Sequence, residues 1–257
     1  DVEATFTGTE GVDTKAQAAM VTQAVKDGYD GIAVDIIHEQ DFDKVVADAL
    51  KAGVPVVAFN TDDTTPNSRL STVSQNLYNA GRTVATRMIE FIPMGTEVLI
   101  TKHDEGITAL DERSRGIQDV LKKHNIKWEV VITTPHPHKA QEIIAKTLKS
   151  KPRIKTVLAT GQADTEGAGL ALENKLASKG YITAGFDLSL NILRLVDAGV
   201  IRFTIDQQPY IQGFYPVIQL TLLIRYGIQP SDIDAGAGVI TKTEAQSVIN
   251  LKKQNYR

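Results

Sequence analysis

Short apolar runs alternate with amphipathic segments along almost the whole chain, and this alternation constrains the fold most. Each apolar run has the length of one buried strand, and the segment after it carries apolar residues at helical spacing. Residues 13–28 show the pattern, because Ala18, Val21 and Val25 fall on one helical face. Asp13 is positioned to cap the first turn. A regular succession of strands and helices predicts an α/β fold with parallel sheets flanked by helices.

The expected elements cover most of the chain. The expected strands are residues 2–8, 30–37, 54–60, 69–73, 96–101, 128–134, 156–160, 181–187 and 201–206. The expected helices are residues 13–28, 41–53, 76–91, 109–124, 138–150, 164–179, 188–199 and 209–226. In the last helix Pro209 takes the first position, where a missing N–H costs nothing. The most loop-like stretches are residues 61–68 and 135–138.

Composition narrows the classes of function. The 257 residues are 42% hydrophobic and 23% charged, with a formal net charge of −3. These values are typical of a soluble globular protein and argue against a nucleic-acid surface, which usually carries a basic stripe. No apolar run approaches the roughly 18 residues of a membrane span. The absence of cysteine excludes disulfides, cysteine metal sites and thiol catalysis.

Polar side chains follow most of the expected strands. In parallel α/β folds, ligands bind outside the carboxyl ends of the strands, so these side chains are candidate ligand contacts. Most are amides and carboxylates, with one arginine near them, and such groups suit the hydroxyls of an uncharged ligand. They are found in residues 60–63, 74–76, 102–105, 135–138, 161–164 and 206–208, and at Asp187 and Arg113.

Five motifs then point to one family: VPVVAFN, DERSRGIQD, TGQADTEGAG, AGFD and TIDQQPYIQG. In this order and spacing the chain resembles the type I periplasmic sugar-binding proteins. The resemblance is to the ribose-binding-like branch, the solute receptors of bacterial ABC importers, and it covers nearly the whole chain. It implies a two-lobed periplasmic-binding-protein type I fold whose lobes are linked by a three-strand hinge. The hinge would lie near residues 74–76, 206–208 and 236–239.

The resemblance also implies the lobe boundaries. The N-terminal lobe would contain residues 1–74 plus 208–236, and the C-terminal lobe residues 75–207 plus 237–257. Family members begin with a strand and helix that have no counterpart here, so the first strand–helix unit is apparently missing. That unit amounts to roughly 30 residues. Truncation, processing and numbering that begins inside a longer chain all stay open as explanations.

The resemblance carries ligand-binding roles onto eight residues: Asn60, Thr61, Arg113, His136, Gln162, Asp164, Asp187 and Gln207. Ribose binders carry Asp-Arg where this chain has Asn60-Thr61, so ribose itself is not indicated. His136 takes the place of an aromatic ring that covers one sugar face. Asp164 is favoured for the polar position after its strand, with Gln162 as the next choice.

Simpler interpretations of these residues stay open. Arg113 and Asp187 are also consistent with solvated charges at the ends of elements, and Asn60 with the turn that begins a loop. Gln207 is consistent with an amide that satisfies backbone groups of the hinge. His136 is consistent with a surface loop. It has no accompanying ligand cluster with metal-site spacing, so neither a metal nor a cofactor is expected.

The expected function is reversible binding of a small sugar or polyol in the cleft between the lobes, with hinge closure around it. The closed form would deliver its ligand to the membrane permease subunits of an ABC importer. No nucleophile–base pair is recognisable, so the chain is not expected to be an enzyme. We expect a periplasmic or extracytoplasmic monomer whose signal peptide has been removed.

Two other functions share this fold. One is the effector-binding core of a LacI-type transcription regulator, and the other is the sensor domain of a sugar-sensing receptor. Among ligands, hexoses, pentoses, inositol-like polyols and a furanose signal molecule all stay open.

Overall fold

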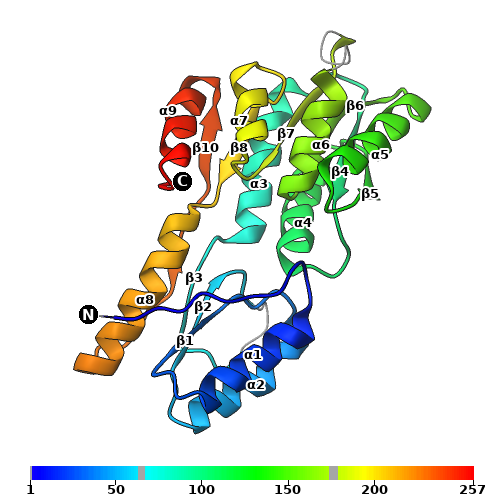
Figure 1. Ribbon diagram of the computed structural model, residues 1–257. Coiled ribbons are helices and arrows are strands. Elements are labelled where there is room, and N and C mark those ends of the chain that lie inside the picture. Colours follow the sequence, from blue (N-terminus) through cyan, green and yellow to red (C-terminus); the bar gives the residue numbers. More distant parts are fainter. Residues whose placement is uncertain (1, 63–66, 174–178) are drawn as a thin grey trace. The chain divides into compact units, whose positions relative to one another are not determined.

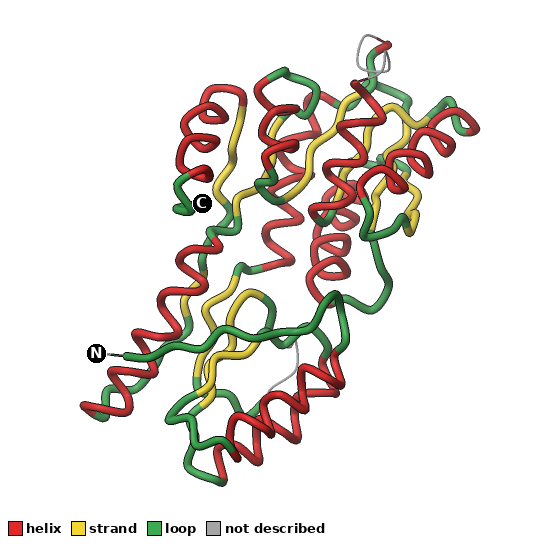
Figure 2. The backbone as a smooth tube through the Cα atoms, in the orientation of Figure 1, coloured by secondary structure: helices red, strands yellow, loops and turns green. Residues whose placement is uncertain are grey.

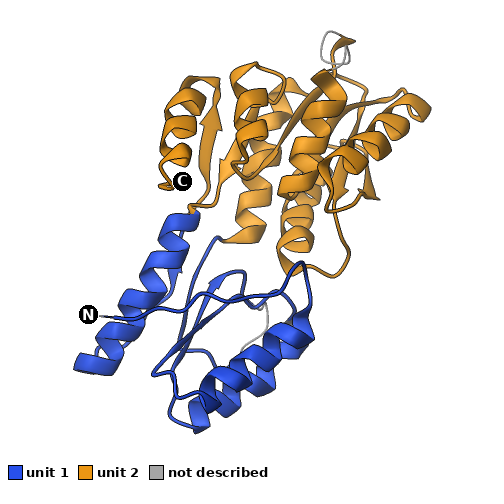
Figure 3. Ribbon diagram, viewed as in Figure 1, with its two compact units in different colours: residues 1–75, 209–235 blue, residues 76–208, 236–257 orange. Residues whose placement is uncertain are grey.

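The computed structural model describes residues 2–62, 67–173 and 179–257. The chain forms two compact units, unit 1 with residues 1–75 and 209–235 and unit 2 with residues 76–208 and 236–257 (Figure 3). Each unit contains a sheet of mostly parallel strands flanked by helices, so the predicted fold class is confirmed. The role of the units as ligand-binding lobes stays a prediction.

Unit 1 is built on four parallel strands in the order β1-β2-β3-β9. Helices α1 and α2 cover one face of this sheet and α8 the other (Figure 1). Aliphatic side chains of the sheet and of α1 and α2 form a core, among them Val46 and Val56, which are fully buried. The elements are α1 (Thr14–Lys26), β1 (Ile32–Val34), α2 (Glu39–Lys51), β2 (Val56–Asn60), β3 (Ser71–Ser74), α8 (Pro209–Tyr226) and β9 (Ile233–Asp234).

Residues 2–8 differ from the sequence prediction. The pattern predicts a strand, but the segment belongs to a loop that leads into α1 (Figure 2). Phe6 is 93% exposed. A strand needs a neighbour for its backbone hydrogen bonds, and among the described residues none of the strands pairs with this segment. The local preference for extended backbone is therefore not realised as sheet.

Unit 2 contains a sheet in the order β10-β8-β7-β6-β4-β5, in which only the β10–β8 pair is antiparallel. Helices α3 and α4 lie on one face, and α5, α6, α7 and α9 on the other (Figure 1). The strands are β4 (Glu97–Lys102), β5 (Trp128–Ile132), β6 (Ile154–Ala159), β7 (Ile182–Phe186), β8 (Phe203–Asp206) and β10 (Gly238–Thr241). The helices are α3 (Leu77–Met88), η1 (Ile89–Phe91), α4 (Thr108–Lys123), α5 (Pro137–Ser150), α6 (Gln162–Glu173), α7 (Leu190–Asp197) and α9 (Lys242–Lys253).

Local signals explain where several helices begin. Asp13 accepts a hydrogen bond from the Ala16 backbone N–H, as predicted for an N-cap. Pro209 is the first residue of α8, also as predicted. Helix α9 is not among the predicted helices, although Thr241 and Glu244 form a capping box at its start. Parts of two predictions, residues 63–66 of the loop 61–68 and residues 174–178 of the helix 164–179, lie outside the described residues.

Candidate functional site

The sheet of unit 2 gathers polar side chains along one of its edges. Strands β8, β7, β6 and β4 are neighbours and parallel, so the residues that follow them share the carboxyl edge of the sheet. Gln207 follows β8, Asp187 follows β7 and His103 follows β4. Arg113 reaches these residues from α4.

Arg113 is buried, at 3% exposure, which is an unusual position for a guanidinium. It is held there because α4 packs backbone to backbone against α3. A Cβ at Gly81 would lie 2.0 Å from the Arg113 carbonyl oxygen, and a Cβ at Gly116 would lie 2.1 Å from that of Tyr78. Any larger residue at either glycine would push the two helices apart and move the guanidinium.

The Arg113 guanidinium is bonded on two sides. It donates to the Thr160 carbonyl oxygen and to Gln207 Oε1, each at 2.9 Å. Its central carbon also lies 4.1 Å from the centre of the Phe186 ring, in cation–π contact. Burial lowers the pKa of Arg113, and the nearby Asp187 carboxylate raises it. The side chain remains charged, because its ordinary pKa is far above neutral.

Gln207 links this cation to a carboxylate. Its Nε2 donates to Asp187 Oδ1 at 2.7 Å, while its Oε1 accepts from Arg113. These two bonds fix the orientation of the amide. Burial raises the pKa of Asp187, and the charge of Arg113 opposes that rise. Asp187 has a left-handed backbone with φ 74°, and its carbonyl oxygen accepts from the Thr204 hydroxyl at 2.7 Å.

Asp164 is a second carboxylate at this edge, and it is fully buried at the start of α6. Its Oδ1 accepts from the Thr133 hydroxyl at 2.5 Å. Burial raises its pKa to about 7, although the Thr133 hydroxyl and backbone N–H groups of Gly161 and His103 lower it. Its Oδ2 is buried and has no hydrogen-bond partner within the described residues. A buried carboxylate oxygen without a partner is costly unless a ligand completes it.

His103 has a similar incomplete environment. Burial lowers its pKa, so the imidazole is neutral at pH 7. Its Nδ1 is buried without a hydrogen-bond partner in the part of the chain that the structure describes. Gly161 allows the ring to pack closely, because a Cβ there would lie 2.8 Å from His103 Cδ2. His103 follows a strand in the sequence, but its neighbourhood with Asp164 emerges only from the fold.

Two predicted residues are exposed and separate from this network. Gln162 is the first residue of α6, and His136 is the N-cap residue of α5. No described hydrogen bond ties either side chain to Arg113, Asp187 or Gln207. Their role as ligand contacts stays a prediction.

Unit 1 carries a smaller polar cluster at the carboxyl ends of β1 and β2. Asn60 ends β2, and Thr61, which is 3% exposed, follows it. Both donate to Asp35, from Asn60 Nδ2 at 2.8 Å and from the Thr61 backbone N–H at 3.1 Å. Asp35 is not among the predicted site residues, because the predicted strand 30–37 includes it. Strand β1 ends at Val34, so Asp35 is in fact a strand-end residue.

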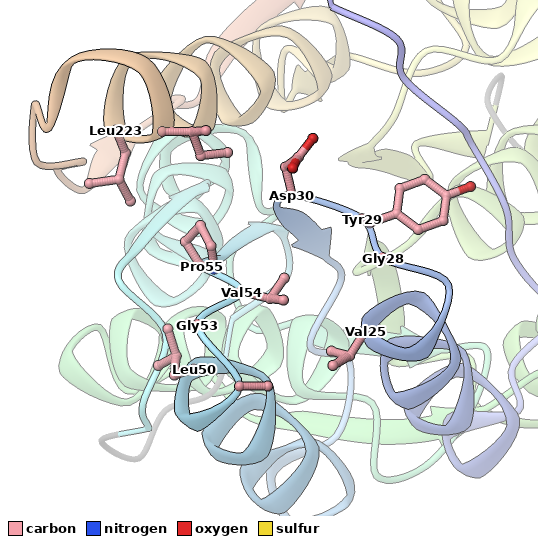
Figure 4. Close-up of a pocket in the computed structure, with 11 residues that line it drawn as sticks. Val25, Gly28, Tyr29, Asp30, Leu50, Gly53, Val54, Pro55 and Leu223 are labelled. Atoms are coloured by element: carbon pink, nitrogen blue, oxygen red, sulfur yellow. The ribbon is translucent and has the colours of Figure 1, made fainter.

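Other features of unit 1 lie away from these side chains. An open hollow lies at the amino ends of β1 and β2, between Tyr29, Pro55 and Leu223 (Figure 4). None of the predicted site residues lines it. Across the described residues, no group of three or more His, Asp or Glu side chains is arranged to hold a metal ion. No described helix is both long and apolar enough to cross a membrane.

Comparison with known proteins shows a similar protein by sequence. The chain is 34% identical over 257 residues to the xylose/arabinose-binding protein XylF of Sulfolobus acidocaldarius, with 94% of this chain covered. The chain spans 64% of the length of that relative.

Two solved structures share the fold. A carbohydrate transporter from Acidothermus cellulolyticus in complex with myo-inositol has 25% identity and a TM-score of 0.85, covering 95% of this chain and 85% of that one. An ABC transporter solute-binding protein from Burkholderia graminis in complex with D-arabinose has 26% identity and a TM-score of 0.85, covering 91% and 83%. A family model described as a periplasmic binding protein domain matches residues 1–227. The chain therefore belongs to the periplasmic binding protein domain family.

Proposed function

We propose that the protein is a solute-binding protein that reversibly binds a small neutral sugar or polyol without catalysing a reaction. The observation that carries the proposal is the network of Arg113, Gln207 and Asp187. Beside it lie Asp164 Oδ2 and His103 Nδ1, which have no hydrogen-bond partner among the described residues. Acceptors and fixed amides of this kind suit hydroxyl groups, which both donate and accept hydrogen bonds.

The charge balance of the network favours a neutral ligand. Arg113 is close enough to Asp187 for each charge to perturb the pKa of the other group. A ligand carboxylate would meet the Asp187 and Asp164 carboxyl groups as well as a guanidinium whose charge is already balanced. A sugar hydroxyl instead can donate to Asp164 Oδ2 without adding charge to a buried site.

The relatives support a monosaccharide-sized ligand. Their descriptions refer to xylose, arabinose and myo-inositol, all small neutral compounds with several hydroxyls. We further propose that Asn60 and Thr61 contribute from unit 1, and that His136 and Gln162 are outer contacts. As in ABC importers, the partner would be a membrane permease and the location extracytoplasmic, with the protein acting as a monomer.

A thermal-shift screen tests the function. The panel contains D-xylose, L-arabinose, D-arabinose and myo-inositol, with D-glucuronate as an acidic comparison. A ligand present at 100 times its Kd stabilises the folded state by about 2.7 kcal/mol, which raises Tm measurably. We expect at least one neutral compound to raise Tm and glucuronate to have no effect. Unchanged Tm with every neutral compound would contradict the proposal.

Two variants locate the binding. Asp187→Asn removes the carboxylate that Gln207 and Arg113 organise, so the Tm shift should be lost at ligand concentrations that saturate the unmodified protein. Asp197→Asn makes the same chemical change at the end of α7, outside the network, and should keep the shift. Loss of the Tm shift in both variants, or in neither, would contradict a role for the network in ligand binding.

A further inference from the structure

Backbone hydrogen bonding between the segments that follow β1 and β2 continues past the ends of the two strands. The two strands pair in parallel, with Val34 opposite Ala58. Past that point the Ile36 backbone N–H still donates to the Thr61 carbonyl oxygen at 3.0 Å. Asp35 and Asn60 therefore sit in neighbouring backbone segments that are fixed to each other, and their contact does not depend on a flexible loop.

The Asp35 carboxylate collects several donors. Asn60 Nδ2 donates to its Oδ2 at 2.8 Å, and the Thr61 backbone N–H donates to its Oδ1 at 3.1 Å. The Thr61 side chain also lowers the pKa of this carboxyl group. Burial raises the pKa of Asp35 to about 6 against the effect of these donors, so the group is ionised at pH 7. An ionised acceptor makes the bond from the Asn60 amide a strong one.

The Asn60 amide can take only one orientation beside this carboxylate. With Nδ2 toward Asp35, a donor meets an acceptor, whereas the flipped amide would place Oδ1 against the carboxylate oxygen. The Asn60 backbone is left-handed, with φ 61°, which further restricts how the side chain can leave the strand. In the described part of the chain, Oδ1 accepts no hydrogen bond. Oδ1 is therefore available as an acceptor.

We propose that Asp35 is a positioning residue that locks the Asn60 amide, so that Asn60 Oδ1 accepts a hydrogen bond from a hydroxyl of the ligand. This inference rests on the proposed function, and it adds a requirement that unit 1 places on the ligand. The group opposite Asn60 must be a donor. A ligand with a carbonyl, a carboxylate or only hydrogen at that position loses the bond, and the first two oppose one acceptor to another.

The fixed orientation of the Asn60 amide can be tested without any ligand. In protein labelled with ¹⁵N-asparagine, the Asn60 side-chain signals are assigned from an Asn60→Ser variant. We expect its amide protons to exchange with solvent about tenfold more slowly than those of Asn125, which is exposed and serves as an internal reference. Asp35→Asn should remove that difference, and Asp27→Asn, at an exposed carboxylate that ends α1, should leave it. Equal exchange at both asparagines in the unmodified protein would overturn the lock.

The hydroxyl requirement is tested by calorimetry with the tightest binder among D-xylose, D-arabinose and myo-inositol, and with its singly deoxygenated analogues. One analogue should bind the unmodified protein about tenfold more weakly. Asp35→Asn should weaken the parent compound about tenfold and abolish the discrimination against that one analogue. Asp27→Asn should change neither.

These experiments distinguish failure of the proposed role of Asp35 from failure of the proposed function. Equal losses of affinity for the parent and all analogues in Asp35→Asn, or no loss at all, would overturn the role of Asp35. If no compound in the panel binds the unmodified protein, the proposed function fails, and the exchange experiment alone then decides whether Asp35 locks Asn60.

Discussion

Asp164→Asn should make the protein more stable at high pH, and by an amount that depends on pH. The folded-state pKa of Asp164 is about 7, compared with 3.8 for an unburied aspartate. A raised pKa means that the folded state binds the proton more tightly than the unfolded state. The proton on Asp164 therefore stabilises the folded state fully below pH 3.8, and this stabilisation is lost as pH rises through about 7. Asparagine does not titrate, so the variant should not show this loss.

The magnitude follows from the two pKa values. Each pKa unit corresponds to about 1.36 kcal/mol, so the rise from 3.8 to about 7 is worth about 4 kcal/mol. The difference in unfolding free energy between variant and unmodified protein should therefore grow by up to about 4 kcal/mol between pH 4 and pH 8. A constant offset is also expected, because asparagine keeps the bond from Thr133 to Oδ1 only if its NH2 group takes the place of the buried Oδ2.

Urea unfolding at a series of pH values measures this difference. Trp128 is the only tryptophan of the chain and belongs to β5 in unit 2, so its fluorescence reports on the unit that contains Asp164. Asp197→Asn is the matched control and should keep the pH profile of the unmodified protein. A difference that stays flat from pH 4 to pH 8 would refute the reasoning, because it would mean that the Asp164 carboxyl is not desolvated.

Three further substitutions test individual contacts. Arg113→Lys keeps the positive charge but loses the planar guanidinium, so the bond to Gln207 or another contact of the guanidinium is lost. The free energy of unfolding in urea should fall by about 1–3 kcal/mol. An unchanged free energy of unfolding would contradict the buried geometry of Arg113. Gln207→Ala should weaken sugar binding about tenfold in calorimetry, and should also lower the unfolding free energy by about 1–3 kcal/mol, since Asp187 loses a donor. An unchanged unfolding free energy is the result expected of an amide that only contacts ligand, and would contradict a structural role for Gln207 in the network. In unit 1, Gln219→Leu leaves the buried Ser71 hydroxyl without its acceptor, so the unfolding free energy measured by circular dichroism should fall by about 1–3 kcal/mol. Adding Ser71→Ala should recover part of that free energy. No recovery would argue against the hydrogen bond between Ser71 and Gln219.

Sequence patterns predict the part of the site that directly follows well-formed strands. Asp187 and Gln207 come after β7 and β8, whose buried apolar runs are easy to recognise. The contact between them and Arg113 is not predictable from pattern, because it depends on the close approach of α3 and α4 at Gly81. Whether each of these residues binds the ligand stays a prediction.

Residues at uncertain strand boundaries are harder to predict. Asp35 is hidden inside a predicted strand because the apolar residues after it, Ile36 and Ile37, continue the run although β1 has already ended. Both isoleucines are buried in the core beside α2, so apolar character here reflects packing and not strand backbone. The opposite error occurs at residues 2–8, whose composition is strand-like but which pair with none of the described strands.

The most direct test of the account is a crystal structure of the complete protein with the sugar or polyol that gives the largest Tm shift. We expect ligand oxygens within hydrogen-bond distance of Asp187, Gln207 and Asp164 Oδ2. We also expect a ligand hydroxyl directed at Asn60 Oδ1. A ligand bound elsewhere, for example in the hollow of Figure 4, with no contact to the unit 2 network, would contradict the proposed function.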